Sequence, residues 1–526
     1  MSSDPQCVQQ IVLNQDENGL PYDSLEISYP RRGKPAVSPY PDTLPETLFD
    51  SSYDDQQYLL RIIRTRNTTF TLSDNDVWLP GLEDTTRVDA GVFSASIVPV
   101  TGVSLEWCLG EGQVQLPGHS SETYAGHSCV VYTGNEGKPV FPPLIAWTEV
   151  ADLDEHALSA FDGIISTEEL TSLLKESGRF TTRIPFDDSN STVYVSYQGL
   201  TGYAGETGFY RPLTQRQSEL MGIITLSWDT HYCAVVSTTD AAGLHVTAHY
   251  DYRFIAPEKT IDVNDNITLA HYDALGYLIS TRFNGTENGL KQGYTLPEEE
   301  ATPFKEPVTI EDALSLSAGI PVAGLQVRCP LSWMPVATDI LKGSAVDTDC
   351  LTEDGYITHL AWRRRHGRTD TPTGQPPHIL TVVTDRYDGD PEQQLRQTIS
   401  FSDGFGRLLQ GAVRHDGGEA WQRTESGGLV VEKDGPVSKE TSFRWAVSGR
   451  TEYDGKGQPV RAYQPYYLDT WKYVSDDSAR QDLFADTHHY DPAGRENCVV
   501  TAKGWQRRTF YTPWFVVSED ENDTLE

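Results

Sequence analysis

Apolar and polar residues alternate over short stretches through most of this 526-residue chain. Alternation with a period of two places apolar side chains on one face of an extended strand and polar side chains on the other. The stretches are rich in Val, Ile, Thr and Tyr, and Gly, Pro, Asn and Asp separate them, as is typical of strands joined by tight turns. The pattern therefore predicts a mainly β protein. The clearest stretches are Gln57–Ile63, Gly91–Val98, Cys129–Thr133, Thr192–Tyr197 and Gly222–Trp228.

A five-residue phrase recurs between such stretches: an Asp, two variable residues, a Gly, and the first residue of a new extended run. The Asp side chain can cap backbone N–H groups of a turn, and the Gly tolerates the positive φ with which the chain re-enters a strand. We therefore predict a structural role for the Asp and the Gly of each copy, as hairpin residues. The five copies hold Asp240 and Gly243, Asp273 and Gly276, Asp403 and Gly406, Asp454 and Gly457, and Asp491 and Gly494; Tyr272, Tyr453 and Tyr490 precede three of them.

The spacing of the phrase bears on the architecture. The last three copies lie 51 and 37 residues apart, which is too irregular for a solenoid with a strict period. His249-Tyr-Asp251 and His271-Tyr-Asp273 recur 22 residues apart and indicate one strand-pair unit used twice. We therefore expect a large, spiralling antiparallel sheet with insertions and a few short helices.

Helix signals are few and local. Ser166-Thr-Glu-Glu169 is a capping box ahead of Leu170, Leu173 and Leu174, and Gly178 is expected to end this helix. Further short helices are expected at Asp154–Phe161, from Thr309 to Leu316, and at Ser475–Phe484. We expect a β-rich segment over residues 1–150, a short helical insertion over 151–180, a β-rich segment with hairpins over 181–300, a linker with a short helix over 301–320, and a C-terminal β segment over 321–526.

Composition narrows the class of protein. The chain has 41 basic and 76 acidic residues, a formal net charge of −35, which argues against nucleic-acid binding because phosphate would be repelled. Solubility is the simplest role of this charge, and affinity for a cationic partner is a sharper one. The seven cysteines are scattered and are expected to be buried thiols. No stretch approaches the roughly 18 apolar residues of a membrane span, and no signal peptide is visible at Met1–Cys7.

Two sequences match the start of a nucleophile elbow without completing it. They are Gly118-His-Ser120 and Gly126-His-Ser128. The elbow needs a second Gly two residues after the Ser, for a tight turn from strand to helix. Glu122 and Val130 stand at those positions, so we expect no catalytic serine here.

Candidate metal and phosphate sites are also incomplete. Asp262-Val-Asn-Asp-Asn266 matches half of a calcium loop, but Ile267 stands where the loop needs Gly and Asp273 where it needs Glu. A turn rich in Asn and Asp is the better account. Gly134–Lys138 lacks the spacing of a phosphate loop. His488-His489 is most simply part of a strand, with a surface metal contact left open. We expect no catalytic, cofactor-binding or metal-binding residues.

Longer phrases around the turns resemble a known family. His489-Tyr-Asp-Pro-Ala-Gly-Arg495 resembles a full Rhs, or YD, repeat. The sequence around these turns is similar to the C-terminal part of the B component of insecticidal toxin complexes, and the similarity spans essentially the whole chain. The phrases that carry it include Pro142–Ala146, Thr238–Leu244, Tyr387–Arg396, Phe401–Gln410, Trp445–Asp454, Val474–Arg480 and Tyr511–Asn522.

The resemblance implies a non-catalytic part of a hollow β shell. In that family the B and C components together enclose the C component's toxic domain, and the B component docks through a β-propeller onto a pore-forming A component. The secretion-associated region and the propeller have no counterpart here, so the resemblance implies the C-terminal piece of a B component. Its expected partners are the C component and the rest of the B component, with the A-component pore only an indirect one. It implies synthesis in the bacterial cytoplasm and an extracellular, secreted complex. An acidic shell would suit a basic cargo.

Two other classes remain as alternatives. One is a secreted or surface YD-repeat protein that mediates adhesion or binds carbohydrate through its Tyr and Trp side chains. It predicts glycan binding by the isolated chain. The other is an enzyme, which the incomplete motifs disfavour.

Overall fold

A computed structural model describes most of the chain. The described residues are 4–41, 44, 46–74, 76–97, 102–109, 116–118, 123–187, 191–218, 220–330, 332–333, 375–433 and 435–524. His119, Ser120 and Cys350 lie outside them. The chain forms two compact units: unit 1 comprises 1–247 with Thr512–Phe515, and unit 2 comprises 248–511 with 516–526. The boundaries expected at 150, 180, 300 and 320 fall inside these units and stay predictions.

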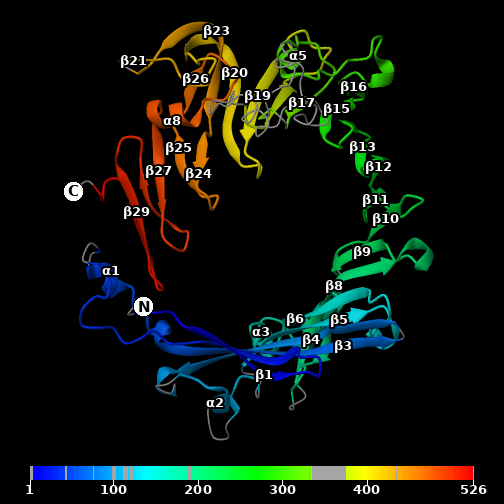
Figure 1. Ribbon diagram of the computed structural model, residues 1–526. Helices are drawn as coiled ribbons and strands as arrows, with labels where there is room; N and C mark the ends of the chain where they lie inside the picture. Colours follow the sequence, from blue (N-terminus) through cyan, green and yellow to red (C-terminus); the bar gives the residue numbers. More distant parts are fainter. Residues whose placement is uncertain are drawn as a thin grey trace. The chain divides into compact units, whose positions relative to one another are not determined.

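Strands dominate both units, which confirms the prediction of a mainly β, antiparallel protein (Figure 1). Among the described residues, 22 strands share one hydrogen-bonded sheet, six others form a second sheet and two form a small hairpin. Nearly all of the ladders are antiparallel between neighbours in the sequence, because short turns join consecutive strands. One parallel contact joins Trp421 to Leu468. No helix within the described ranges combines the length and the apolarity that a membrane crossing needs.

Unit 1 contains the first eleven strands and four α-helices. Its long central hairpin, β3 with β4, accounts for much of its sheet. The strands are β1 (Val8–Gln15), β2 (Pro21–Ser28), β3 (Leu59–Asp74), β4 (Val77–Ser94), β5 (Tyr124–Tyr132), β6 (Ile145–Leu153), β7 (Arg179–Arg183), β8 (Thr192–Tyr203), β9 (Pro212–Ser218), β10 (Ile224–Trp228) and β11 (Val235–Thr239). The helices are α1 (Glu46–Ser51), α2 (Leu105–Leu109), α3 (Glu155–Ser159) and α4 (Thr167–Glu176), with 3-10 turns η1 (Asp55–Tyr58), η2 (Ala95–Ile97), η4 (Asn135–Gly137) and η5 (Glu206–Gly208).

Unit 2 contains the remaining strands, and the boundary between the units falls within β12 (His245–Asp251). The next strands are β13 (Ala256–Ile261), β14 (Ile267–Tyr272), β15 (Leu278–Glu287), β16 (Leu290–Gly293), β17 (Gly324–Cys329), β18 (His378–Thr384), β19 (Leu395–Ser402), β20 (Leu408–Trp421), β21 (Val431–Glu432) and β22 (Gly435–Pro436). Then follow β23 (Ser438–Ser448), β24 (Thr451–Tyr453), β25 (Pro459–Tyr463), β26 (Tyr466–Leu468), β27 (Ala485–Tyr490), β28 (Glu496–Val500), β29 (Gln506–Tyr511) and β30 (Val516–Glu519), with η6 (Pro297–Glu299), α5 (Ile310–Leu314) and α8 (Asp476–Asp482).

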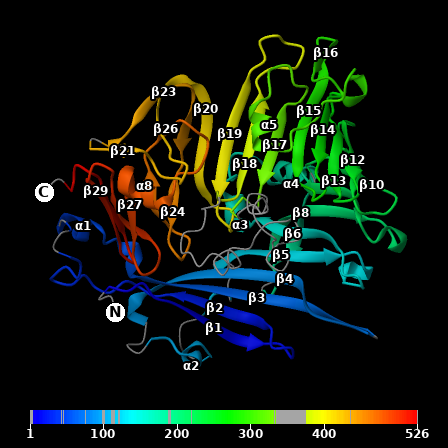
Figure 2. The same ribbon diagram turned by 45° about the horizontal axis from the view of Figure 1, so that its top comes forward.

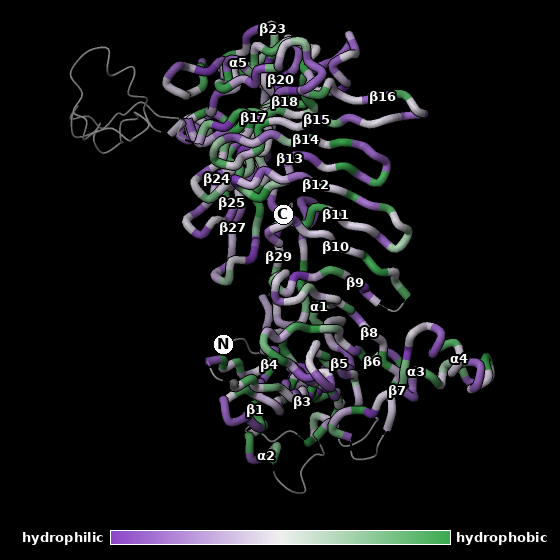
Figure 3. The backbone as a smooth tube through the Cα atoms, turned by 90° about the vertical axis from the view of Figure 1, so that its right-hand side faces the viewer, coloured by the Kyte–Doolittle hydropathy of each residue, from purple (hydrophilic) through white to green (hydrophobic). Residues whose placement is uncertain are grey.

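Local sequence explains the helices. The Ser166 hydroxyl accepts a hydrogen bond from the Glu169 N–H and caps α4, and Gly178 follows with φ +77°. Asp154 caps α3 and Thr309 caps α5 in the same way. The predicted helices are confirmed, each shorter than expected by a few residues. Figure 3 shows α3, α4 and β7 together on one side of unit 1.

The core of unit 2 lies on one face of strands β17 to β20 and β23 and includes residues of α5. Figure 1 shows α5 beside β17 and β19. Register places buried side chains in rows across the strands, and alternation then places the intervening side chains on the other face. One buried row is Val327, Leu380, Ile399, Ala412 and Val447. The other face has no residue in the buried class. Its rows include Arg328, Ile379, Ser400, Gly411 and Ser448; Gln326, Thr381, Thr398, Val413, Ala446 and Tyr467; Gly324, Val383 and Arg396; His415 with Arg444; and, further along β20 and β23, Glu419 with Glu440.

Strands β12 to β14 differ from this arrangement. They lie side by side in Figure 2, yet every residue from 241 to 279 is half-buried or exposed. Polar and apolar positions mix along them (Figure 3). Unit 1 has two smaller cores, one around Leu25, Ile27, Leu60 and Ile62 and one around Ile184, Val193 and Val195.

Thiol burial departs from the prediction. Of the described cysteines only Cys108 is buried, whereas Cys7 and Cys233 are exposed. The prediction of buried thiols is therefore wrong for these two. Both stand next to turns or chain ends, where alternation gives no indication of which side chains a core will cover.

Candidate functional site

The five Asp-x-x-Gly phrases share one geometry. The Asp backbone N–H donates to the carbonyl of the fifth residue at 2.9–3.1 Å, and the Gly N–H donates to the Asp carbonyl at 2.9–3.2 Å. The Gly residues have φ between +80° and +86°, a conformation that costs other residues about 1–2 kcal/mol. Unit 1 holds the copy at Asp240, and unit 2 holds the other four.

Each Asp side chain is turned back onto its own turn. Its Oδ1 accepts the N–H of the fifth residue at 2.9–3.0 Å in all five copies. In the first four copies Oδ1 also accepts the N–H of the third residue, at 2.8–2.9 Å. The carboxylate thus accepts backbone N–H groups of the turn that have no carbonyl acceptor in a neighbouring strand.

These bonds favour the ionised carboxylate. The N–H of Gln458 lowers the pKa of Asp454, and the N–H and the guanidinium of Arg495 lower the pKa of Asp491. At Asp403 partial burial works in the opposite direction, but the hydrogen bonds from Arg407 outweigh it and the pKa is lowered.

The Tyr that precedes the Asp ties its hairpin to an earlier one. The Tyr453 hydroxyl donates to the Leu408 carbonyl at 3.2 Å, just after the turn at Asp403. The Tyr490 hydroxyl donates to the Pro459 carbonyl at 2.7 Å, just after the turn at Asp454. The Tyr272 hydroxyl likewise reaches the Pro257 carbonyl, at 3.0 Å. We call these three hydroxyl–carbonyl bonds the tyrosine struts.

Arginine at the fifth position adds a second connection. Arg407 donates through Nε to Asp403 at 2.6 Å, and its guanidinium carbon lies 4.6 Å from the centre of the Tyr453 ring. Arg495 repeats this with Asp491, and its guanidinium carbon lies 4.5 Å from the centre of the Tyr511 ring. Guanidinium groups over aromatic faces stabilise by about 0.5–1 kcal/mol at exposed sites. The phrase therefore closes a hairpin and joins it to its neighbour.

Other turns with the same geometry were missed as copies. Asp16–Leu20 is a complete Asp-x-x-Gly phrase, with Oδ1 bonds to Asn18 and Leu20. Thr501–Trp505 uses a hydroxyl in place of the carboxylate. Asp262–Asn266 has Asp265 in the Gly position at φ +61°, which confirms the prediction of a turn. A search for Asp or Thr three residues before Gly would have found the first two.

The chemical motifs fall in ordinary secondary structure. Gly126-His-Ser128 lies inside β5, paired with β4, and not at a turn from strand to helix. The His488 imidazole pairs with Glu496 at 2.6 Å. Within the described ranges, no three His, Cys, Asp or Glu side chains gather as a metal site would require.

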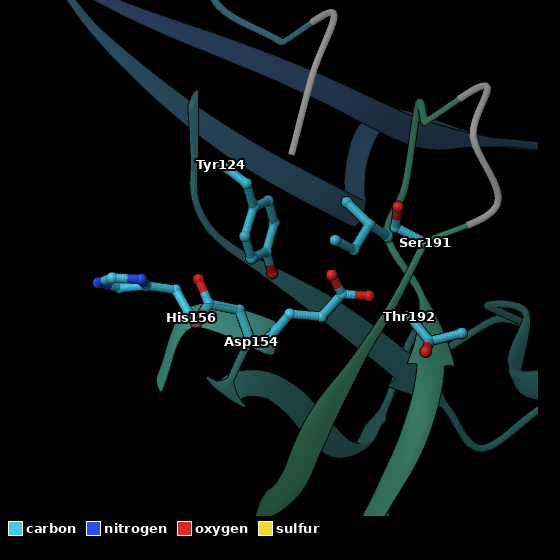
Figure 4. Close-up of a pocket in the computed structure, with 7 residues that line it drawn as sticks. Tyr124, Asp154, His156, Ser191 and Thr192 are labelled. Carbon is cyan, nitrogen blue, oxygen red and sulfur yellow. The ribbon is translucent and has the colours of Figure 1, made fainter. Parts of the chain in front are cut away.

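A cavity of about 430 Å³ in unit 1 is lined by Tyr124, Asp154 and His156 among others (Figure 4). The Tyr124 ring points into it, and the hydroxyl lies 2.7 Å from Nδ1 of His127. Burial lowers the pKa of His127 to about 4 and raises the pKa of Tyr124. Asp154, also at the cavity, is engaged in capping α3. The hydrogen bond between Tyr124 and His127 therefore joins a protonated phenol to a neutral imidazole, and neither group of this pair is a charged base.

Comparison with known proteins gives the family. Residues 1–82 match the family described as the insecticide toxin TcdB middle/C-terminal region. The crystal structure of TcdB2-TccC3-Cdc42 is 44% identical over 99% of this chain, with a TM-score of 0.91. A Photorhabdus luminescens Tc holotoxin pore gives the same identity, coverage and TM-score, and TcdB2-TccC3 gives a TM-score of 0.86. No curated protein matches the chain.

The match covers the chain almost completely but only part of each relative. The chain spans about a quarter of the length of those solved chains, 25% for the first and 23% for TcdB2-TccC3. The similarity goes beyond a common fold, because 44% of the residues are identical over 99% of this chain. The chain therefore belongs to the TcdB-like B components of insecticidal toxin complexes and corresponds to their middle/C-terminal region.

Proposed function

We propose that this chain is a non-catalytic, wall-forming part of a bacterial insecticidal toxin complex. Together with a C component and the rest of the B component, it would enclose a toxic domain before the A-component pore delivers it. The observation that carries the proposal is the 44% identity over 99% of the chain to solved TcdB2-TccC3 structures. Secretion as part of that complex belongs to the same proposal.

The geometry supports a structural role. The carboxylates, hydroxyls and guanidinium groups of the repeated phrase form contacts within turns and struts, as at Asp403, Tyr453 and Arg407. Long ladders with paired strands leave few free edges, which suppresses aggregation of a large sheet. The polar groups of the motif are thus already engaged within the protein, as expected of residues that build a wall.

Co-expression with a C component tests this proposal. The chain, joined to the remaining part of its B component, is co-expressed with a C component and the purified material is treated with protease. We expect a stable complex in which the toxic domain survives digestion. The control is the C component expressed alone, whose toxic domain should be degraded. Equal digestion in both samples, with no complex on size-exclusion chromatography, would contradict the proposal.

A further inference from the structure

Asparagine followed directly by glycine occurs three times in the chain, as Asn18-Gly19, Asn284-Gly285 and Asn288-Gly289. Asparagine is thermolabile, and it is most labile before glycine, which has no side chain to hinder attack by its own backbone nitrogen on the asparagine side chain. The dipeptide itself is identical in the three copies. Their surroundings in the folded protein therefore decide which of them reacts.

Asn288 and Gly289 form the two-residue turn between β15 and β16. Glu287 pairs with Leu290 on either side of them, and φ is +52° at Asn288 and +78° at Gly289. Positive φ at both central positions is the type I′ turn, which favours Asn-Gly. Every residue from 286 to 290 is exposed, and Figure 3 shows this hairpin at the rim of the sheet. Solvent therefore surrounds the turn.

Hydrogen bonds do not restrain the two groups that would react in this turn. Within the described part of the chain, neither the Asn288 side-chain amide nor the Gly289 N–H has a hydrogen-bond partner. The copy at Asn18 differs in both respects. The Gly19 N–H donates to the Asp16 carbonyl at 3.0 Å, and the Asn18 amide nitrogen lies 3.4 Å from the Thr71 hydroxyl. Asn18 should therefore react more slowly than Asn288.

The copy at Asn284 is the most protected, although it lies only four residues before Asn288 on β15. Asn284 is 7% exposed, and its amide nitrogen donates to the Tyr294 carbonyl at 3.2 Å. The ladders place it opposite Ile267 on one side and Gly293 on the other. Its backbone is thus fixed between two partner strands. Reaction at Asn284 requires local opening of β15, which slows it.

We propose that Asn288 is a site of spontaneous deamidation in the folded protein and that Asn284 is protected from it. The Gly289 nitrogen attacks Cγ of Asn288. The N–Cγ bond forms, the Cγ–Nδ2 bond breaks, and the proton of the attacking nitrogen leaves with the departing ammonia. Water then opens the cyclic imide at either carbonyl, which gives aspartate or isoaspartate. The proposal does not depend on the toxin-complex function, because it concerns the isolated chain.

The modification has a structural consequence for β16. Isoaspartate adds one carbon atom to the backbone of a two-residue turn, and the geometry of the type I′ turn does not accommodate it. Strand β16 has only four residues, and its Lys291 forms an ion pair with Glu299. We therefore expect β16 to lose its pairing with β15 gradually as isoaspartate accumulates.

The test incubates the full chain in warm, mildly alkaline buffer and follows each asparagine by mass spectrometry. Trypsin cleaves after Arg282 and Lys291, so one peptide holds both Asn284 and Asn288, and fragmentation shows which of them has become heavier by one dalton. We expect Asn288 to react at least about tenfold faster than Asn284 in the folded chain, with Asn18 between them. In concentrated urea the three rates should agree within about threefold, because the surroundings are lost.

Three results would overturn the proposal. They are no reaction at Asn288 in the folded chain, a rate at Asn284 or Asn18 that equals or exceeds the rate at Asn288, and the same ratio of rates in urea as in the folded chain. A second measurement follows amide exchange in β16 before and after incubation. Exchange should accelerate in the wild type and stay constant in N288Q, and equal acceleration in N288Q would refute the effect on β16.

Discussion

Two regions of unit 2 have the same kind of strands and turns but differ in whether a hydrophobic core covers them. A hydrophobic core covers one face of strands β17 to β20 and β23, and Leu380, Ile399 and Phe401 are fully buried in it. Strands β12 to β14 have no residue in the buried class. Both regions carry the turn phrase, at Asp403 and at Asp273, with matching hydrogen bonds. The difference therefore lies in what covers the sheet.

The comparison separates strand formation from strand stability. The turns and the ladder hydrogen bonds set the register of β12 to β14, since no buried face specifies it there. Covering one face adds apolar burial, which contributes about 1.5–3 kcal/mol for each large side chain. We therefore expect unit 2 to open first at β12 to β14 and last at its covered strands.

The largest effect is expected from L380A, in the covered strands. Removing a fully buried Leu side chain typically costs 2–5 kcal/mol, and we expect about 3 kcal/mol of unfolding free energy here. The matched control L269A, in β14, removes a half-buried side chain and should cost about 1 kcal/mol or less. Urea unfolding followed by tryptophan fluorescence measures both. Equal losses would remove the distinction between the regions.

A smaller effect is expected from G406A. The position has φ +80° and no heavy atom within 4 Å of an added Cβ, so the change isolates the backbone cost of about 1–2 kcal/mol. G404A, in the same turn, also has open space and no positive φ, and it should be neutral or slightly stabilising. Thermal unfolding compares the two variants, and a loss as large in G404A would show that the turn does not depend on φ.

Removing one tyrosine strut should cost less. Y453F keeps the ring beneath Arg407 and loses the hydroxyl bond to the Leu408 carbonyl, a change of about 1 kcal/mol. Y272F removes the equivalent strut in the uncovered region. Amide exchange should accelerate more widely around Y272F, because no core holds those strands. Faster exchange confined to the immediate neighbours of the substituted Tyr in both variants would show that the covered and the uncovered strands do not differ in stability.

The smallest effect is expected from mild acidification. Burial lowers the pKa of His378 below its usual 6.5, although a bond to the Pro376 carbonyl opposes this. The unfolded chain therefore takes up the proton first, and stability falls as pH drops through 6.5. Between pH 7 and pH 6 the loss should stay below about 1 kcal/mol. Urea unfolding at both pH values should show it in the wild type and not in H378Q. A pH dependence that persists in H378Q would assign the effect to another group.

Much of the fold could be predicted from sequence because its signals are local. Turn phrases, caps such as Ser166 and alternation each act over a few residues, and most of the strands and helices they predict are present. One departure is Ala95–Ile97, a 3-10 turn within the stretch Gly91–Val98 that was expected to be extended. Burial was not predictable in the same way. The alternation in β14 and in β18 is similar, yet only β18 meets a core, since that depends on α5 and other segments distant in sequence. Sequence also does not show that Arg328, Arg396 and Arg444 share one face, because the register of separate strands places them there.

The tyrosine struts all point one way along the chain. Tyr272, Tyr453 and Tyr490 each bond to a carbonyl that precedes them in sequence. During synthesis on the ribosome, the carbonyl that accepts each tyrosine strut has therefore already emerged when its Tyr appears. The phrase thus gives the growing chain a sequential order of assembly from the N-terminus, which suits a sheet too large to collapse in one step.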